Sequence, residues 1–437
     1  MSSEDRRNML GSLNPSPHDH QEQDPSATDL QYRQIIQPSP AIQMRQLLIS
    51  CAELISHSDF SAAHRLISIL SAHSSPYGDS TERLVHQFVR ALSLRPNHSH
   101  ATASAFILNT SNASTSITTT ATTTNMSSIT QFDSSLQSSY LSLNQITPFI
   151  RFSHLTANQA ILEAIEVGQQ AIHILDFDIM HGVQWPPLMQ ALAERSSDTL
   201  LPPPMLRITG TGHDLNILQR TGDRLLKFAH SLGLRFQFHP LLILNDDPTS
   251  VALYLPSALT LLPDEALAVN CVLYLHRLLK DDYRDLRLFL HKIKALNPKV
   301  VTIAEREANH NHPLFLQRFV EALDHYTAIF DSLEATLPPN SRERLAVEQI
   351  WFGREIVDIV AAEGDNRRER HERFESWEVI LRSSGFANVP LSPFALSQAK
   401  LLLRLHYPSE GYQLQIFNNS FFLGWQNRSL FSISSWR

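Results

Sequence analysis

The segment from Ala171 to Leu192 reads AIHILDFDIMHGVQWPPLMQAL. Its first six residues are mostly apolar on both faces of an extended chain, which is typical of a strand buried in a parallel sheet. Gly182 then breaks the chain, and apolar residues return at helical spacing. The segment therefore predicts a strand, a short loop and a helix.

The loop of this segment is where a binding site is expected, because ligands of open α/β sheets bind outside the carboxyl ends of the strands. His and Asp can bind metals, but their spacing here matches no recognised metal site. A buried core histidine and helix-capping aspartates are the favoured interpretation. Trp185 either packs in the core or covers the crevice, and Pro186 fits an early helix position. The candidate crevice residues are His173, Asp176, Asp178, His181, Gly182, Gln184, Trp185 and Pro186.

Strands and helices alternate from Phe149 onward, which predicts a doubly wound, mostly parallel sheet of the α/β class. The expected parallel strands are 171–176, 205–209, 234–240, 267–274 and 300–304. Three alternating runs, 412–417, 420–426 and 429–434, predict an antiparallel edge at the C-terminus. This plan is also that of class I methyltransferases.

Composition divides the chain into four parts. Residues 1–40 are polar and proline-rich, which predicts a disordered tail. Residues 41–95 carry apolar positions at helical spacing and predict a helical cap. Residues 96–140 are rich in Ser and Thr and predict a disordered linker. The α/β core is expected over 141–437.

Several ordered motifs resemble the GRAS family of plant transcriptional regulators. Residues 171–192 are similar to its VHIID block, 44–95 to its first leucine-rich region, 298–355 to its PFYRE region and 377–436 to its SAW region. The version of these blocks looks most like the lateral suppressor branch. The residues carrying family motifs are Pro298, Phe319, Tyr326, Arg354, Glu355, Trp377, Trp425 and Trp436.

The resemblance implies a nuclear, non-enzymatic regulator with a role in axillary meristem initiation and shoot branching. It implies partners as well: DNA-binding transcription factors such as C2H2 zinc-finger proteins, and other GRAS proteins in a homo- or heterodimer. The leucine-rich regions that flank the VHIID-like block are expected to bind them.

Charge and composition agree with an intracellular protein that leaves most promoter contact to a partner. The net charge is −7 and only two cysteines are present, so a basic DNA-binding surface and a disulfide framework are both disfavoured. The densest basic cluster is Arg367, Arg368 and Arg370. A solvated helix face is favoured for it over a nuclear import signal or a phosphate contact. No leader peptide and no membrane span are expected.

The enzymatic alternative is an S-adenosylmethionine-dependent methyltransferase, or a small-molecule-binding protein, on the same fold. Such enzymes need glycines after the first strand so that backbone can approach the cofactor. Here Phe177–His181 should fill that volume and only Gly182 remains. No cofactor and no metal are therefore expected.

One short motif could dock a partner directly. Leu275, Leu278 and Leu279 form a literal LxxLL, which can bind a coregulator groove as a helix. Because the motif directly follows an apolar strand, a buried helix is the favoured interpretation.

Overall fold

The computed structural model describes residues 39–95, 125–199, 202–243 and 247–437. The predicted tail 1–40, except for its last two residues, and most of the predicted linker lie outside these ranges. By its contacts the chain forms two units, residues 1–43 and 44–437. The described part of the first unit is residues 39–43, which include the beginning of helix α2 (Pro40–Ser56).

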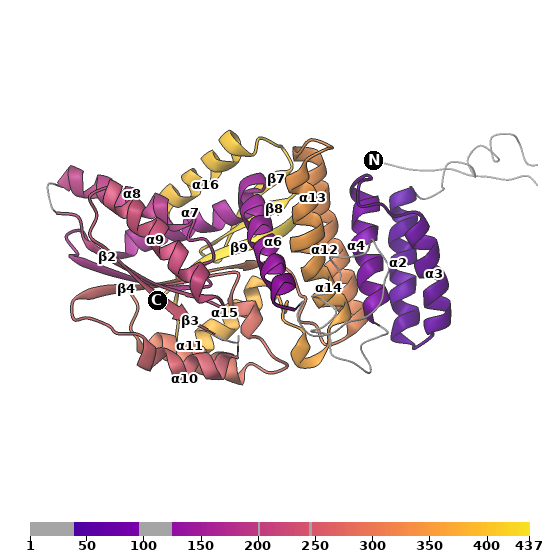
Figure 1. Ribbon diagram of the computed structural model, residues 1–437, viewed down its shortest axis with the longest axis horizontal. Coiled ribbons are helices and arrows are strands. Elements are labelled where there is room, and N and C mark those ends of the chain that lie inside the picture. The colour runs from indigo at the N-terminus through magenta and orange to yellow at the C-terminus, as the bar shows by residue number, and fades with distance from the viewer. Residues whose placement is uncertain (1–38, 96–124, 200–201, 244–246) are drawn as a thin grey trace, which may run out of the picture. The chain divides into compact units, whose positions relative to one another are not determined.

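The second unit is built on one sheet, which has nine strands within the described ranges (Figure 1). Their order is β3-β2-β1-β4-β5-β9-β8-β7, and β6 pairs with β9. Strands β1 to β5 pair in parallel, whereas β9 runs antiparallel to β5 and β8. The predicted α/β fold class is therefore confirmed. The strands are β1 (Ala171–Phe177), β2 (Met205–Gly212), β3 (Phe236–Leu242), β4 (Glu265–Val272), β5 (Val300–Arg306), β6 (Asn388–Val389), β7 (Tyr412–Phe417), β8 (Ser420–Trp425) and β9 (Arg428–Trp436).

Helices cover both faces of the parallel part, because alternate residues of each strand point to opposite faces. Ile172 and Ile174 of β1 pack in one core with α7, α8 and α9. Leu175 and Phe177 pack in a second core with α10, α11 and α15. These helices are α7 (Pro148–Ala164), α8 (Trp185–Thr199), α9 (Leu215–Ser231), α10 (Pro248–Ala258), α11 (Arg284–Ala295) and α15 (Phe374–Ser383).

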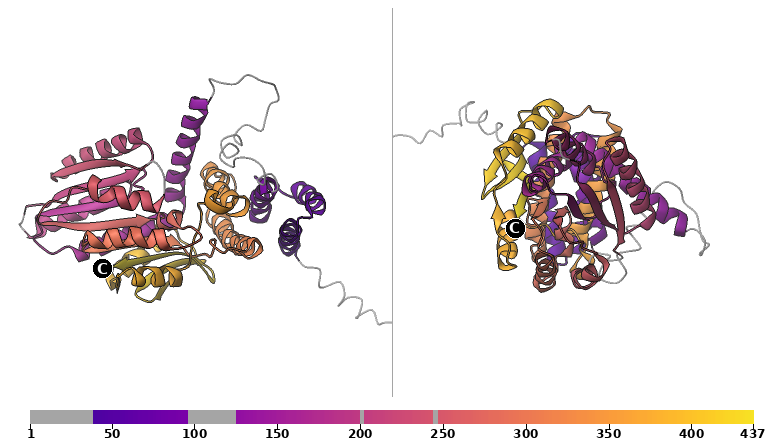
Figure 2. Two further views of the ribbon diagram at one scale, coloured as in Figure 1. Left: turned by 90° about the horizontal axis from the view of Figure 1, so that it is seen from below. Right: turned by 90° about the vertical axis from the view of Figure 1, so that its left-hand side faces the viewer.

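The helical cap joins helices that lie between β5 and β9 in sequence. Helix α4 packs against α12 and α14, and these lie between it and the sheet (Figures 1 and 2). Side chains cap two helices of this region: Asp59 accepts a bond from the Ala62 amide, and Asp79 and Glu82 form a capping box. The cap is thus fixed to the core through helices rather than laid over a sheet face. The helices concerned are α3 (Phe60–Ala72), α4 (Ser80–Leu94), α12 (Phe315–Thr336), α13 (Arg342–Ala346), the π-helical turn η3 (Val347–Phe352) and α14 (Gly353–Ala361).

The predicted linker ends earlier than residue 140. Helix α6 (Asn125–Ile146) occupies its last third, and Tyr140 is buried with its ring 5.5 Å from that of Trp351. The part of the prediction that covers 125–140 is therefore wrong. Ser and Thr have modest helix propensity, but tertiary packing of a few apolar residues overrides it.

The C-terminal meander is confirmed, with β9 in the interior of the sheet. Asn418 and Asn419 both have positive φ, as a two-residue hairpin turn requires. Helix α16 (Pro393–His406) precedes the meander, and the 3-10 turns η2 (Leu275–Leu278) and η4 (Gly364–Asn366) lie in the connections. Both Cys51 and Cys271 are free and buried. None of the helices in the described ranges is long and apolar enough to cross a bilayer.

Candidate functional site

A cavity of about 300 Å³ lies at the carboxyl ends of β1, β4 and β5. Its wall combines the loop after β1 and the turn after β4 with residues of α6, η3 and α14. Of the predicted crevice residues, Asp176, Asp178 and Gln184 line it. The other lining residues include Tyr140, His154, Asn270, His276, Arg277, Arg306, Trp351, Arg354, Glu355, Arg368 and Glu369.

Asp176 is held by two side chains at the end of β1. Its carboxylate accepts bonds from the Trp185 indole nitrogen at 2.8 Å and from the Asn270 amide at 2.7 Å. Gln184 bonds to Asn270 and, through its backbone oxygen, to the Asn158 amide. The expectation that Asp176 caps backbone N–H groups is therefore wrong, because side-chain donors take that place.

Asp176 is nearly inaccessible to solvent, and this sets its charge. Burial raises the pKa of its carboxyl from 3.8 to about 7, against the lowering effect of the bonds from Asn270 and Trp185. Because the folded chain binds this proton more tightly than the unfolded chain, Asp176 stabilises the fold most below about pH 4. That contribution is lost as the pH rises through about 7.

Replacement of Asp176 by Ala is expected to lower the free energy of unfolding by about 1–3 kcal/mol. The change leaves the buried donors of Trp185 and Asn270 without an acceptor, and unsatisfied buried donors carry that cost. Chemical denaturation at pH 6 measures the effect. Asp223→Ala, at an exposed position of α9, is the control and should change little. Equal stability of the two variants would contradict the prediction.

The loops around the cavity have unusual backbone geometry. Asp178, Met180 and Leu273 all have φ between 49° and 60° and all line the cavity. Non-glycine residues rarely adopt this region, and each costs of order 1–2 kcal/mol. Gly182 also has positive φ, and a Cβ there would lie 2.9 Å from Thr221 Cγ2. Packing of the loop must hold this geometry, so the loop is a fixed wall.

The loop after β1 does not fill the crevice as the sequence suggested. Phe177 turns into one core and stacks on Tyr274, and Ile179 packs in the other. Both side chains also line the cavity, as Met180 does. The expectation of a filled cofactor volume is therefore wrong in part, although the glycines that let backbone approach a cofactor are still missing.

The remaining predicted crevice residues are structural. His173 is fully buried on the other face of β1 and bonds to Thr209 Oγ1 at 2.9 Å, so the prediction of a core histidine is confirmed. Trp185 is 0% exposed and packs in the core, and Pro186 follows it in the first turn of α8. His181 does not line the cavity.

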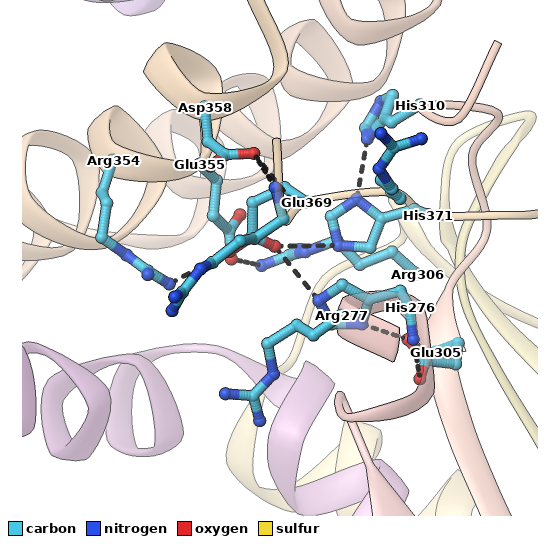
Figure 3. Close-up of polar contacts among 12 residues, drawn as sticks. His276, Arg277, Glu305, Arg306, His310, Arg354, Glu355, Asp358, Glu369 and His371 are labelled. Atoms are coloured by element: carbon cyan, nitrogen blue, oxygen red, sulfur yellow. Dashed lines mark hydrogen bonds and ion pairs between the residues drawn. The ribbon is translucent and has the colours of Figure 1, made fainter. Parts of the chain in front are cut away.

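Charged side chains from distant parts of the chain form the opposite wall (Figure 3). His276 lies between two carboxylates: Nδ1 is 2.7 Å from Glu305 and Nε2 is 3.1 Å from Glu369. Burial would lower the pKa of His276, but these carboxylates raise it to about 9. Burial would likewise raise the pKa of Glu369, but His276 and Arg354 hold it below its usual value. The wall is thus a network of buried ions.

Three family-motif residues, Tyr326, Arg354 and Glu355, join this network. Glu355 accepts bonds from the Tyr326 hydroxyl at 2.8 Å and from Arg306 at 2.7 Å, and Arg354 donates to Glu369 at 3.2 Å. The other motif residues are core. Phe319 and Trp425 share one hydrophobic cluster, Trp377 and Trp436 share another, and Pro298 is buried before β5.

The LxxLL motif cannot dock a partner in this fold. Leu275, Leu278 and Leu279 are at most 2% exposed, and the motif begins as a 3-10 turn. The prediction of a buried element is confirmed and the docking hypothesis is wrong. The side chain between these leucines, His276, faces the cavity wall instead.

The basic cluster is not a solvated helix face. Residues 367–373 form a coil between η4 and α15, and Arg367 and Arg370 are 4% and 2% exposed. Arg367 donates to the His310 carbonyl, and Arg370 bonds to Asp281 and Asn311. Two of the three guanidinium groups are therefore used inside the fold and cannot bind phosphate or an import receptor.

Five residues of this polar network were not predicted from the sequence: His276, Glu305, Arg306, Glu369 and His371. Ligands of open α/β sheets bind outside the carboxyl ends of the strands. This rule, applied to β4 and β5 as well as to β1, would have identified Asn270, Glu305 and Arg306. For Glu369 and His371 no such signal exists, because they come from a coil that folds back onto the sheet edge.

Comparison with known proteins agrees with this architecture. Residues 44–437 match the model of the GRAS domain family. Scarecrow-like protein 18 of Arabidopsis thaliana is 57% identical over 413 residues, which cover 90% of this chain and 91% of that protein. Protein MONOCULM 1 of Oryza sativa subsp. japonica is 46% identical over 418 residues, covering 90% and 88%.

A solved structure shows the same fold. The crystal structure of SCL7 in Oryza sativa is similar with a TM-score of 0.72 and 34% identity, covering 92% of this chain and 100% of that one. The motifs, the strand order and these similarities agree. The chain therefore belongs to the GRAS domain family and is a regulator of the GRAS type.

Proposed function

We propose that the chain is a non-enzymatic nuclear regulator that reaches promoters through a DNA-binding transcription factor of the C2H2 zinc-finger class. In the plant it acts in axillary meristem initiation and shoot branching. The similarity to MONOCULM 1 and Scarecrow-like protein 18 supports this branch of the family. Pairing with other GRAS proteins belongs to the same proposal.

An exposed apolar stripe on α16 is the observation that most directly supports a function through protein partners. Phe394, Leu401 and Leu405 are 59%, 44% and 61% exposed. Their spacing of seven and four residues places them on one face of the helix. Large apolar side chains that share an exposed face mark interaction sites. Lys400 and Arg404 flank the stripe, so it suits an amphipathic partner helix with acidic residues at its rim.

Charge supports an indirect route to DNA. The net charge is −7, and autonomous DNA binding depends on neutralising phosphates with Lys and Arg. The buried state of Arg367 and Arg370 removes the densest basic cluster from the surface. A basic DNA-binding partner would supply the phosphate contacts, and its charge would favour association with this chain.

The test compares two exposed leucines. Leu405→Asp is expected to abolish promoter occupancy and co-purification with the zinc-finger partner, because it places a charge in the stripe. Leu253→Asp, on α10 and 65% exposed, is the matched control and should behave like wild type. Chromatin immunoprecipitation measures occupancy, and circular dichroism confirms folding. Normal occupancy by the folded Leu405→Asp variant would refute the stripe as the partner site.

The cavity is the basis of a second hypothesis for the function. Its volume of about 300 Å³ is at the lower end for small-molecule sites, so an S-adenosylmethionine-dependent enzyme is the rival hypothesis. The proposal expects no saturable heat in a calorimetric titration with S-adenosylmethionine. Saturable binding that Asp176→Ala removes would overturn the non-enzymatic assignment.

A further inference from the structure

Three buried side chains, two of which (His276 and Glu369) line the cavity, converge on one point. His276 Nε2 lies 3.1 Å, and His371 Nε2 lies 3.4 Å, from Oε2 of Glu369 (Figure 3). The three ligand-type atoms all lie within 4.8 Å of one another. Two ligands on a tetrahedral ion, with bonds of about 2.0–2.1 Å, are roughly 3.3–3.4 Å apart. The spacing of these atoms therefore suits a small divalent ion after minor adjustment.

The outer atoms of the same side chains are fixed by further partners. Nδ1 of His276 is 2.7 Å from Glu305, and Nδ1 of His371 is 2.9 Å from Nδ1 of His310. The second oxygen of Glu369 accepts a bond from Arg354. Metal-binding histidines usually donate their other ring N–H to such a partner, which fixes tautomer and ring orientation. Both rings therefore direct Nε2 toward Glu369.

Nε2 of His371 has an unexplained environment. It is fully buried and makes no hydrogen bond. If His371 donates from Nδ1 to His310, Nε2 presents a lone pair to the Glu369 carboxylate. A cation held between these two atoms, which lie 3.4 Å apart, would be attracted by both.

The backbone around Glu369 is held rigidly. The Asp358 carboxylate accepts the amide N–H groups of Arg368 and Glu369 at 2.9 and 2.8 Å. The His371 carbonyl accepts the amides of His310 and Asn311. Preorganised ligands of this kind lose little freedom when an ion binds.

We propose that His276, Glu369 and His371 bind a Zn²⁺ ion through Nε2, Oε2 and Nε2, and that the ion displaces the Nε2 proton that His276 otherwise shares with Glu369. Two histidines and one glutamate are a known zinc ligand set, in which a further position stays open. Because His276 and Glu369 line the cavity, that position would be filled from the cavity. The ion would join the turn after β4 to the coil before α15. This inference goes beyond the proposed function, which stands whether or not the ion binds.

The test uses the full chain without a histidine tag, freed of metal by chelation. Titration with Co²⁺, followed by visible d–d absorption, is expected to show one saturable site that Zn²⁺ displaces. His371→Gln should weaken binding more than tenfold, and Glu305→Gln should weaken it about 10–100-fold as a ring-orienting residue. His154→Gln, a buried histidine in the same cavity wall, is the matched control and should bind like wild type.

A thermal measurement separates loss of the ion from loss of the fold. Zn²⁺ should raise the melting temperature of the wild type and of His154→Gln, because an ion that binds only the folded state stabilises it. It should leave a folded His371→Gln variant unchanged. Absence of a saturable Co²⁺ spectrum in the wild type overturns the proposal. So does undiminished affinity in folded His371→Gln, since other histidines such as His18 and His20 would then supply the ligands.

Discussion

Truncation after Gln426 is expected to unfold the whole of residues 44–437 rather than remove a tail. Strand β9 pairs with β5 on one side and β8 on the other. Its apolar side chains Leu430, Phe431, Ile433 and Trp436 are at most 1% exposed. Burying one such side chain stabilises a fold by about 1.5–3 kcal/mol. The four together contribute about 6–12 kcal/mol, which is comparable to the roughly 5–15 kcal/mol by which domains are stable.

The truncated chain should lose its cooperative thermal transition in circular dichroism and all partner interactions together. Arg437→Ala, which removes only an exposed side chain and keeps the backbone bonds to Ala387, is the control and should melt like wild type. The rival idea is that the SAW-like end is a docking peptide. That idea would be supported if the truncated chain kept its cooperative thermal transition and lost only one partner interaction.

Arg83→Ala is expected to lower the free energy of unfolding by about 3–5 kcal/mol, because it leaves Glu348 buried without its main counter-ion. Arg83 is 2% exposed and bonds to both carboxylate oxygens of Glu348, at 2.8 and 3.2 Å. Burial raises the pKa of Glu348 and Arg83 opposes that rise. The pair joins α4 to the π-helical turn η3, so the cap should loosen as well.

Urea denaturation of full-length variants measures this effect, with Arg65→Ala as the matched control. Arg65 is an exposed arginine of α3 that bonds to Ser61 on its own helix. Replacing such a residue should change stability by less than about 0.5 kcal/mol. Similar losses in the two variants would show that the Arg83–Glu348 pair contributes nothing beyond an ordinary surface arginine.

The parallel sheet was predictable because its strands are short apolar runs separated by helical patterns. The prediction for β1 missed one residue, and those for β3 and β4 were displaced by two. Helix α7 runs without interruption from Pro148 to Ala164. Its buried centre contains the polar residues Ser153, His154 and Thr156, which from the sequence alone would suggest a helix start, so tertiary contacts maintain the continuous helix.

The crevice was predictable in position but only partly in composition. Asp176 could be placed because it follows a buried strand directly. Glu369 and His371 could not, because their place depends on a coil whose backbone is held by Asp358 and His310. Long-range contacts of this kind leave no periodic signal in a single sequence.

The interior position of β9 has a consequence for synthesis on the ribosome. Strand β9 is translated long after β5, so this edge of β5 stays unpaired until Arg428–Trp436 leaves the exit tunnel. Unpaired strand edges invite aggregation, and pairings between distant segments form slowly. The nascent chain should therefore remain a chaperone substrate until β9 has emerged, and a ribosome that stalls before that point would hold it in that state.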